Sequence, residues 1–514
     1  MRHVTANGWQ AAQGNGERAV ALAISEVRGI VERACARQDV LEACARRDLG
    51  AVITVLNAHG ITQGQISAMT GISHGRLSEW VTRKRRPQAS STFESFADGL
   101  GMPTGARQAL GLAAVMHPAD TPTVLRPREP VPLDGGLEYP GTPAEAADSV
   151  SLLWQADLND QAVLERGLVT PAAWSEASLR WLIAPAASSA GGGEAPGGVR
   201  VGIGDVQRFR DTVEMFRQLD DRFGGGHARD SLIRYLHGDA VRLLRGRYAD
   251  SVGSALLSAV AEATLLAAWM TYDSTPRSPQ AQRYFIQALG LAQAGGDRLL
   301  GAGILDAMSH QATYTGRFRE AANLAQAARS GTSGIATATL TAHFHTMEAR
   351  ALARLGEAKS CDLALSAAVT EYERRRPEAD PAWFQYFDEA ELSAEFGHCL
   401  RDLSRARDAA EHAGRSVGVS ADGQFARSDF FATMVLADSY LAAGEVEQAC
   451  STALVALGAG EQIRSGRCVN YLREFREHLV AAEGTAAVRD FGEQAVQSRL
   501  WRIAARSVDA SAVA

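Results

Sequence analysis

The residues with the clearest chemical potential lie between Ile61 and Pro87, in the stretch ITQGQISAMTGISHGRLSEWVTRKRRP. The stretch ends in an unbroken run of four basic side chains, and His74, Arg76 and Glu79 precede this run. Guanidinium, ammonium and imidazole N–H groups donate hydrogen bonds to phosphate oxygens and to the acceptor edge of guanine, and a carboxylate accepts one from cytosine. This combination predicts a surface that binds a polyanion, with duplex DNA as the leading candidate.

Charge is distributed unevenly along the 514 residues, whose net charge is −7. Between Cys44 and Ser90 there are seven basic residues and only two acidic ones. A basic patch on an acidic protein is typical of a polyanion site of limited area. The alternative is a solvated charge run at the end of a small helical core. We favour the polyanion site because the basic run follows a pattern that positions it.

That pattern predicts two short helices joined by a tight turn at Gly71. Thr62 can cap a helix that begins at Gln63, and Ser73 can cap a second helix over residues 74–82. Glycine accepts the left-handed backbone of the turn without steric cost. The apolar side chains expected to face the core are Ile66, Met69, Leu77, Trp80 and Val81. Two short helices joined in this way form a helix-turn-helix.

Further helices are predicted on both sides of this pair. The segments 48–59 and 91–100 have helical periodicity, and a short helix is expected over 109–115. An amphipathic helix that begins at Val20 is expected to precede them. Together, these elements would bury the apolar faces that two short helices cannot bury alone.

The second helix of a helix-turn-helix enters the major groove of DNA, and proteins of this kind commonly bind two half-sites as dimers. Outward side chains of that helix would contact base edges, while the cap residues and the basic run would contact phosphates. The candidate DNA-binding residues are Thr62, Gln63, Ser73, His74, Arg76, Ser78, Glu79, Arg83, Lys84, Arg85 and Arg86. The expected assembly is a homodimer on double-stranded DNA.

The pattern T-Q-x-x-I-S-x-x-T-G-I-S-x-x-x-L-S-x-W-x-x-x-K-R-R-P closely resembles the Cro/repressor-like (Xre) helix-turn-helix, over residues 44–112. Ser67, where that family favours alanine, and Gly64, inside the first helix, depart from it without removing a predicted contact. The resemblance implies a lambda-repressor-like DNA-binding domain and a role in transcriptional regulation.

From residue 205 to residue 502 the sequence is rich in helix-forming residues and contains a repeat. A small residue or turn is followed five positions later by Ala, Ser or Cys, which would let the two helices of a pair approach closely. The five examples begin at Gly246, Gly316, Gly356, Arg401 and Gly444. Repeats of about 34–47 residues with two helices each are typical of a tetratricopeptide-like α-solenoid.

Other strings extend the resemblance along the chain, among them LLWQADL, AAWSEASLRWLIAP, DDRFGGG, LLAAWMTYD, AQRYFIQALGLA and LDAMSHQATYTGRFREA. They resemble actinobacterial (Streptomyces-type) regulators that couple an Xre domain to a tetratricopeptide-like region. The concave face of such a solenoid suits a peptide or a partner helix, and quorum-sensing regulators of similar layout bind short peptides there. The candidate effector-binding residues are Trp269, Tyr272, Tyr284, Tyr314, Phe344 and His345, with core packing as the alternative for each.

Composition divides the chain into seven expected segments. They are a disordered N-terminus (1–18), a helix-turn-helix domain with its preceding helix (19–116), a linker (117–146), a helical connector (147–184), a flexible linker (185–204), a helical-repeat domain (205–502) and a C-terminal tail (503–514). The expected fold class is all-α, with an N-terminal lambda-repressor-like domain and a C-terminal tetratricopeptide-like solenoid.

Several function classes are disfavoured. No apolar run reaches the roughly 18–20 residues needed to span a membrane, and the N-terminus lacks a signal-peptide pattern, so a cytoplasmic protein is expected. Six scattered cysteines without a CxxC pair predict buried side chains and no metal. Common catalytic motifs are absent, so no enzyme activity or cofactor is expected. The alternative function is a tetratricopeptide scaffold with little or no DNA binding.

Overall fold

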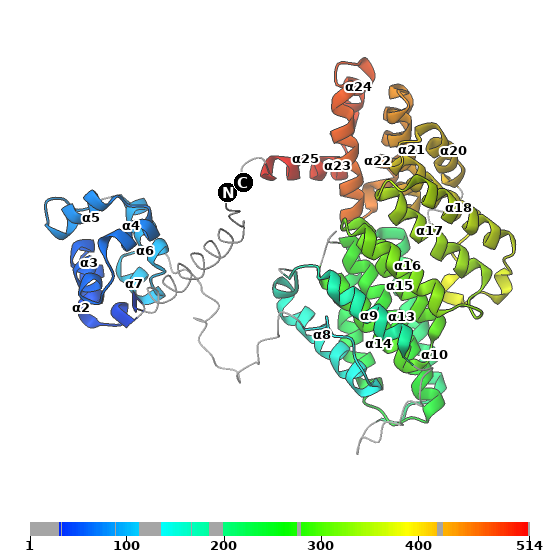
Figure 1. The fold of residues 1–514 in the computed structure, drawn as a ribbon, viewed down its shortest axis with the longest axis horizontal. Helices are drawn as coiled ribbons and strands as arrows, with labels where there is room; N and C mark the ends of the chain where they lie inside the picture. Colours follow the sequence, from blue (N-terminus) through cyan, green and yellow to red (C-terminus); the bar gives the residue numbers. More distant parts are fainter. Residues whose placement is uncertain are drawn as a thin grey trace, which may run out of the picture. The chain divides into compact units, whose positions relative to one another are not determined.

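The computed structural model describes residues 30–31, 33–87, 89–112, 135–165, 167–184, 199–274, 279–418 and 425–511. In these ranges the regular secondary structure is helical, apart from one isolated β-bridge between Arg200 and Arg247. The predicted all-α class is therefore confirmed. The chain divides into two compact units, Met1–Glu129 and Pro130–Ala514, which are described separately (Figure 1).

The described helices of the N-terminal unit are α2 (Gln38–Ala45), α3 (Leu49–Ala58), α4 (Gln63–Thr70), α5 (His74–Val81), α6 (Ser90–Leu100) and α7 (Thr104–Ala109). They enclose one apolar core, which contains the side chains of Val52, Ile66, Leu77 and Phe96. The helices predicted around Gly71 and on both sides of it are present. The expected N-terminal segment 1–18 and most of the helix from Val20 lie outside the described residues.

The trailing helix of this unit differs from the prediction. The helix expected over 109–115 is instead α7, which ends at Ala109. The carbonyl of Pro103 accepts hydrogen bonds from the N–H groups of Ala106 and Arg107 at 3.0 and 3.1 Å, so the helix starts immediately after the proline. Proline is favoured at helix starts because it needs no N–H partner there. Leu110 and Leu112 follow α7 and are buried.

Two glycines allow the helices of this unit to approach closely. A β-carbon on Gly50 of α3 would lie 2.1 Å from the carbonyl oxygen of Trp80 in α5. One on Gly99 of α6 would lie 2.4 Å from the carbonyl oxygen of Met69 in α4. Both distances are far below van der Waals contact, so α4 and α5 are positioned by backbone contacts that only glycine permits.

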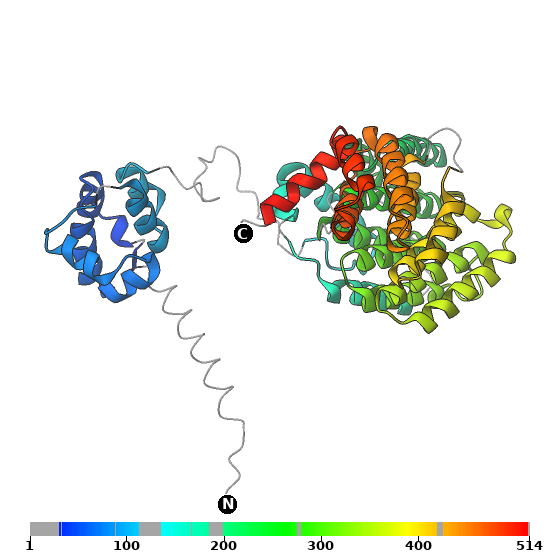
Figure 2. The same cartoon turned by 90° about the horizontal axis from the view of Figure 1, so that it is seen from above.

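The helices of the C-terminal unit are α8 (Pro143–Glu165), α9 (Pro171–Ile183), α10 (Ile203–Phe223), α11 (Arg229–Tyr235), η2 (Leu236–Ala240), α12 (Val241–Leu244), α13 (Asp250–Ser274), α14 (Pro279–Gly295), α15 (Arg298–Tyr314), α16 (Phe318–Gly331), α17 (Ala338–Arg354), α18 (Ala358–Glu373), η3 (Pro377–Ala379), η4 (Ala382–Phe384), α19 (Glu389–Asp402), α20 (Ala406–Ser416), α21 (Ala426–Ala442), α22 (Val446–Ala459), η5 (Gly460–Gln462), α23 (Gly466–Leu479), η6 (Val480–Ala482), α24 (Ala486–Ala495) and α25 (Arg499–Ser511). From α13 to α22 consecutive helices pair as hairpins, and neighbouring hairpins pack against each other (Figure 2).

Four hairpins share one turn geometry. A left-handed backbone occurs at the turn positions Gly316, Gly356, Ser404 and Gly444. In each case a fully buried small residue follows five positions later, namely Ala321, Cys361, Ala409 and Ala449. The predicted pairing of a turn with a small buried residue is therefore confirmed at Gly316, Gly356 and Gly444.

The other two predicted repeats need correction. Arg401 lies inside α19, and the turn is at Ser404, a serine in a position that glycine occupies in the other three hairpins. Gly246 has no left-handed backbone; a β-carbon there would lie 2.4 Å from the side chain of Val201. Ser251 is exposed. Gly246 therefore does not form a hairpin turn. Its lack of a side chain lets the backbone pack closely against Val201, beside the β-bridge.

The strained turn predicts a stabilising substitution. Replacing Ser404 by glycine is expected to raise the free energy of unfolding by about 0.5–1 kcal/mol, because the left-handed backbone costs a non-glycine residue more than glycine's extra chain entropy. Replacing Gly356 by serine, at the equivalent turn, should lower it by a similar amount. Urea unfolding of both variants and the wild type provides the measurement. A Ser404→Gly protein that is less stable than the wild type would contradict this account of the turn.

The expected segment boundaries shift in several places. Residues 135–138 lie against α14, where Arg283 donates to the carbonyl of Gly135 at 3.0 Å and Gln287 donates to those of Gly136 and Glu138. The expected linker to 146 therefore ends before 135, and 113–134 lie outside the described residues. The expected connector 147–184 forms α8 and α9, which pack on α14.

The later boundaries also change. The expected flexible linker 185–204 overlaps the start of α10 at Ile203, and its residues 185–198 lie outside the described part of the chain. The expected tail 503–514 is helical up to Ser511, because α25 continues past residue 502. Trp154 in α8 and Trp174 and Trp181 in α9 are fully buried.

One helix corrects the expectation that no segment is long and apolar enough to span a membrane. By length and composition α13 passes that test, and it is the one described helix that does so. However, 67% of its most apolar window is buried inside the C-terminal unit, where it pairs with α14. A helix covered by neighbours on most sides loses its polar face, which explains the apolar composition of α13 as that of a core helix.

Candidate functional site

The turn between α4 and α5 has the geometry expected from the sequence. Gly71 has a φ of 68°, and its N–H donates to the carbonyl of Ser67 at 3.0 Å. At the start of α4, the hydroxyl of Thr62 accepts from the N–H of Gln65, whose side-chain oxygen accepts from the N–H of Thr62 at 2.9 Å. This capping box occupies the side chain of Thr62 within the protein. Gln63 is half-buried beside it.

Ser73 occupies the N-cap position of α5, but its hydroxyl makes no capping hydrogen bond. Its carbonyl accepts from the N–H groups of Arg76 and Leu77 instead, at 3.0 and 3.2 Å. The expected capping role of this side chain is therefore corrected. The residue is exposed, so its hydroxyl is open to a partner in solution.

The two faces of α5 separate as predicted. Leu77 and Trp80 are buried in the core of the unit. His74 and Arg76 are exposed in the first turn, whereas Ser78 and Glu79 are half-buried. The residues expected to contact bases therefore divide into an exposed pair at the start of α5 and a less accessible pair in its middle.

The basic run turns sharply away from the end of α5. Arg83 takes up a left-handed backbone with φ of 57°, and the N–H of Lys84 donates to the carbonyl of Glu79 at 2.9 Å. The side chains from Arg83 to Arg86 are exposed, and within the described part of the protein none of them has a hydrogen bond or ion pair. The same holds for Arg76. Five cations without a partner among the described residues therefore lie in the first turn of the eight-residue helix α5 and just after its end.

Two other basic residues of this region serve the protein itself. Arg47 donates to the carbonyl of Leu110 at 2.9 Å and lies over the ring of Phe93. Arg46 is 3.8 Å from the carboxylate of Glu42. The free positive charge is therefore smaller than the sequence count of basic residues indicated, and it is concentrated at α5 and the turn that follows it.

The candidate effector residues do not form one site. Trp269, Tyr272 and Tyr314 lie close together. The ring centroid of Tyr272 is 5.7 Å from that of Trp269 and 5.5 Å from that of Tyr314. His310, which the sequence analysis did not single out, completes this group: its ring is 5.3 Å from that of Trp269, and its Nδ1 is 3.2 Å from the hydroxyl of Tyr272. Tyr272 is fully buried, so only part of the group is accessible.

The other three candidates are placed elsewhere. Tyr284 and Phe344 are fully buried. The hydroxyl of Tyr284 donates to the carboxylate of Asp157 in α8. His345 lines a separate surface pocket together with Arg329 and Glu348. For Tyr284 and Phe344 the core-packing alternative therefore applies, and the predicted set must be reduced to the group around Trp269.

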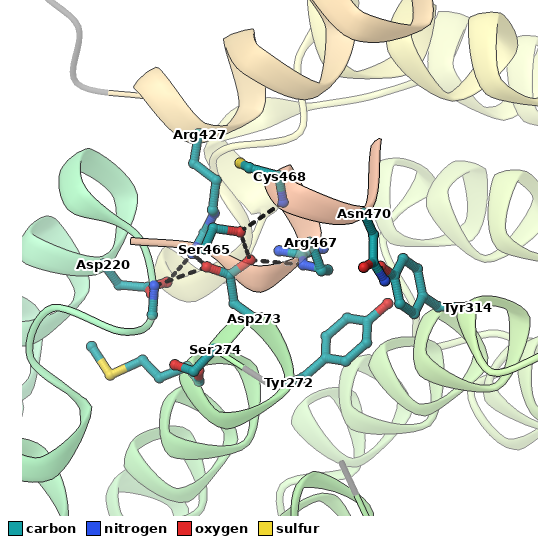
Figure 3. Close-up of polar contacts among 12 residues, drawn as sticks. Asp220, Tyr272, Asp273, Ser274, Tyr314, Arg427, Ser465, Arg467, Cys468 and Asn470 are labelled. Carbon is teal, nitrogen blue, oxygen red and sulfur yellow. Dashed lines mark hydrogen bonds and ion pairs between the residues drawn. The ribbon is translucent and has the colours of Figure 1, made fainter. Parts of the chain in front are cut away.

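A charged cluster that sequence reasoning missed lies beside this group (Figure 3). The carboxylate of Asp273 accepts hydrogen bonds from Ser465 and Arg467 at 2.8 Å and from the N–H of Gly225 at 2.9 Å. Arg427 donates to Asp220 at 2.7 Å and lies 3.7 Å from Asp273. No local motif marks these residues, because the partners are up to 207 positions apart in the sequence.

Burial and pairing act in opposite directions on the two carboxylates of this cluster. Burial alone would raise the pKa of Asp273, but Arg467 and Arg427, together with the hydrogen bonds from Gly225 and Ser465, hold it below its ordinary value. Burial raises the pKa of Asp220 despite its contact with Arg427. Asp273 is therefore the stable anion to which both arginines are attached.

Comparisons with protein-family models, with curated proteins and with solved structures found no match for this chain. Within the described ranges, no group of three or more His, Cys, Asp or Glu side chains could hold a metal ion. The six cysteines are buried, as expected from their spacing.

Proposed function

We propose that this chain is a sequence-specific DNA-binding transcriptional regulator, in which α4 and α5 are the helix-turn-helix of a lambda-repressor-like (Xre) domain. The observation that carries the proposal is the placement, at the two ends of α5, of five exposed cations that have no partner in the described part of the chain. Like charges at close range repel one another, so such a cluster is stabilised by an external polyanion. An α-helix with its side chains is about 10–12 Å across, which matches the width of the major groove.

In this proposal α5 lies in the major groove. His74 and Arg76, in its first turn, donate to the acceptor atoms of guanine. The basic turn from Arg83 to Arg86 contacts the phosphates at the edge of the groove. Ser73 and Gln63, at the starts of α5 and α4, support these contacts at the backbone of the duplex, whereas Thr62 acts by fixing the start of α4.

The C-terminal unit is proposed to be a tetratricopeptide-like solenoid that senses an effector and mediates dimerisation. The repeated hairpins with left-handed turns and buried small residues support this interpretation. The effector class is a peptide, a small molecule or a partner protein, and the group around Trp269 is the candidate contact region. The protein is proposed to act in the cytoplasm without a membrane partner.

Arg76 gives a test of base recognition. Replacing it by alanine is expected to cost about 1–3 kcal/mol in binding to the preferred site and to relax specificity at one base pair. Arg46→Ala is the matched control, because Arg46 is also exposed in this unit but faces Glu42. Fluorescence anisotropy with the preferred duplex and with single-base variants measures both effects. Equal losses for the two variants would argue against base recognition by Arg76.

The alternative is a scaffold that works through protein contacts. The size of the C-terminal unit, Pro130–Ala514, supports this alternative. The two functions predict different outcomes in cells. If the chain acts as a scaffold, replacing Arg76 together with residues Arg83 to Arg86 by alanine leaves its phenotype unchanged. If it is a regulator, these changes have the same effect as deleting the whole chain.

A further inference from the structure

The two ends of the helical stack in the C-terminal unit meet. Each of the helices α13, α15, α17, α19, α21 and α23 contacts the next, and α23 also contacts α13. Helical repeats ordinarily contact only their sequence neighbours. The additional contact therefore closes the series of helices into a ring. We call this contact the seam, and its residues are Trp269, Tyr272, Asp273, Tyr314, Arg427, Phe431, Ser465, Arg467 and Asn470.

At the seam a guanidinium group is held by a carboxylate and three aromatic rings. Arg467 of α23 donates through Nε to Asp273 of α13. Its guanidinium carbon lies 4.7 Å from the ring centroid of Phe431, 4.8 Å from that of Tyr272 and 5.8 Å from that of Trp269. A planar cation between a carboxylate and ring faces is bound both by charge and by cation–π attraction. Phe431 belongs to α21, on the same side as α23, so the α13 side of this arrangement consists of Asp273, Tyr272 and Trp269 and can receive an arginine side chain.

One helical turn further along α23, a second anchor contacts the neighbouring helix. The side-chain amide of Asn470 donates to the hydroxyl of Tyr314 in α15 at 2.5 Å (Figure 3). Residues three apart on a helix lie on the same face. Arg467 and Asn470 therefore present a two-point polar motif, R-x-x-N, to the ends of α13 and α15.

The opposite face of α23 is apolar. Cys468, Leu472, Phe475 and Leu479 belong to a cluster formed by helices α21 to α25. The large cluster that contains Tyr272 and most of the stack from α8 to α17 shares no buried residue with it. The contacts of α23 with α13 and α15 named above are an ion pair, a hydrogen bond and ring contacts, and the segment before α23 adds two backbone hydrogen bonds, from Arg464 to Phe223 and from Gly226 to Arg464. Contacts of this composition are typical of parts that separate and reassociate, because they are also satisfied by other partners or by water.

We propose that the seam is an interaction surface that α23 occupies at rest, and that an arginine-bearing amphipathic helix of a partner protein replaces it when the ring opens. The partner chemistry follows from the receptor: an arginine for Asp273 and its rings, and an amide one turn later for Tyr314. This inference names the partner class for the proposed effector-sensing function and rests on it. It is nevertheless tested without DNA, so its failure and that of the DNA-binding proposal are distinguishable.

The test uses the full chain and a synthetic peptide. The peptide has the sequence of residues 461–480 with Cys468→Ser and carries a fluorophore. The protein is compared with its Arg467→Ala/Asn470→Ala variant, whose own α23 lacks both anchors. In that variant Asp273 keeps its contacts with Gly225 and Arg427. Anisotropy is expected to show saturable binding at least tenfold tighter to the variant than to the wild type. A control peptide that also carries Arg467→Ala and Asn470→Ala should bind at least tenfold more weakly.

Two outcomes would overturn the proposal: no peptide binding to the folded variant, or equal binding of both peptides. If circular dichroism shows that the variant does not fold, amide hydrogen exchange of the wild-type protein is used to test whether the seam opens. The amides of α23 are then expected to exchange faster than those of α17, and excess peptide should accelerate them further. Exchange of α23 at the rate of α17, unchanged by the peptide, would show that the seam does not open.

Discussion

Replacing Arg83, Lys84, Arg85 and Arg86 together by alanine is expected to weaken DNA binding by about a hundredfold or more at low salt. Each phosphate contact releases about 0.9 counterion, so the slope of log K against log salt should fall by about three to four units. The reason lies in the structure: these side chains are exposed and have no partner in the described part of the protein. Titrations of the same duplex at several salt concentrations give the affinity and the slope together.

The matched control keeps the positive charges and replaces three guanidinium groups by ammonium groups. Arg83→Lys, Arg85→Lys and Arg86→Lys in one protein leave four cations in the same turn, so the salt slope should stay close to that of the wild type. An alanine variant with an unchanged slope would show that the basic turn does not contact phosphate. A lysine variant with the slope of the alanine variant would show that charge is not the cause.

Replacing Gly50 by alanine is expected to destabilise the N-terminal unit by about 3 kcal/mol or more and to abolish DNA binding. The added methyl group would lie 2.1 Å from the carbonyl oxygen of Trp80, on the buried side of α5. Backbone atoms cannot swing aside as a flexible side chain can, so α3 and α5 must separate and the core between them must open. Thermal unfolding followed by circular dichroism, together with the anisotropy assay, measures both effects.

Gly105 provides the control for this substitution. It lies in α7 of the same unit, and a β-carbon there would meet nothing within 4 Å. Gly105→Ala is expected to stabilise the unit by about 0.5–1 kcal/mol through helix propensity and to leave DNA binding intact. If Gly50→Ala behaves like Gly105→Ala, the packing of α3 against α5 is not what positions the candidate interface.

The N-terminal helices could be predicted from the sequence because their signals are local. Thr62, Gly71 and the apolar residues between them and Trp80 act within one or two helical turns. The role of Gly50 could not be predicted, since it depends on a contact with a residue 30 positions away in the chain. For the same reason, the sequence could not show that Arg47 is engaged within the protein and does not add to the free positive charge. Its partners, Leu110 and Phe93, are distant in the sequence.

The repeat pattern of the C-terminal unit is predicted correctly at Gly316, Gly356 and Gly444, and it is wrong at Arg401 and at Gly246. Ser404 has the backbone of a turn glycine but no sequence signal for it, so the turn was assigned to Arg401. Tyr284 and Phe344 failed as effector candidates because helical periodicity does not tell which face of a helix is covered by other helices. The seam could not be predicted at all, since Asp273 and Arg467 meet only when the stack closes.

The most direct test of DNA recognition by α5 is genome-wide footprinting of the tagged chain beside its Arg76→Ala variant. The wild type is expected to recover a short, roughly palindromic sequence whose half-sites lie about 34–36 Å apart. The variant should lose enrichment at these sites while remaining folded. Recovery of no sequence above the untagged control, from cells in which the folded chain is present, would contradict the account.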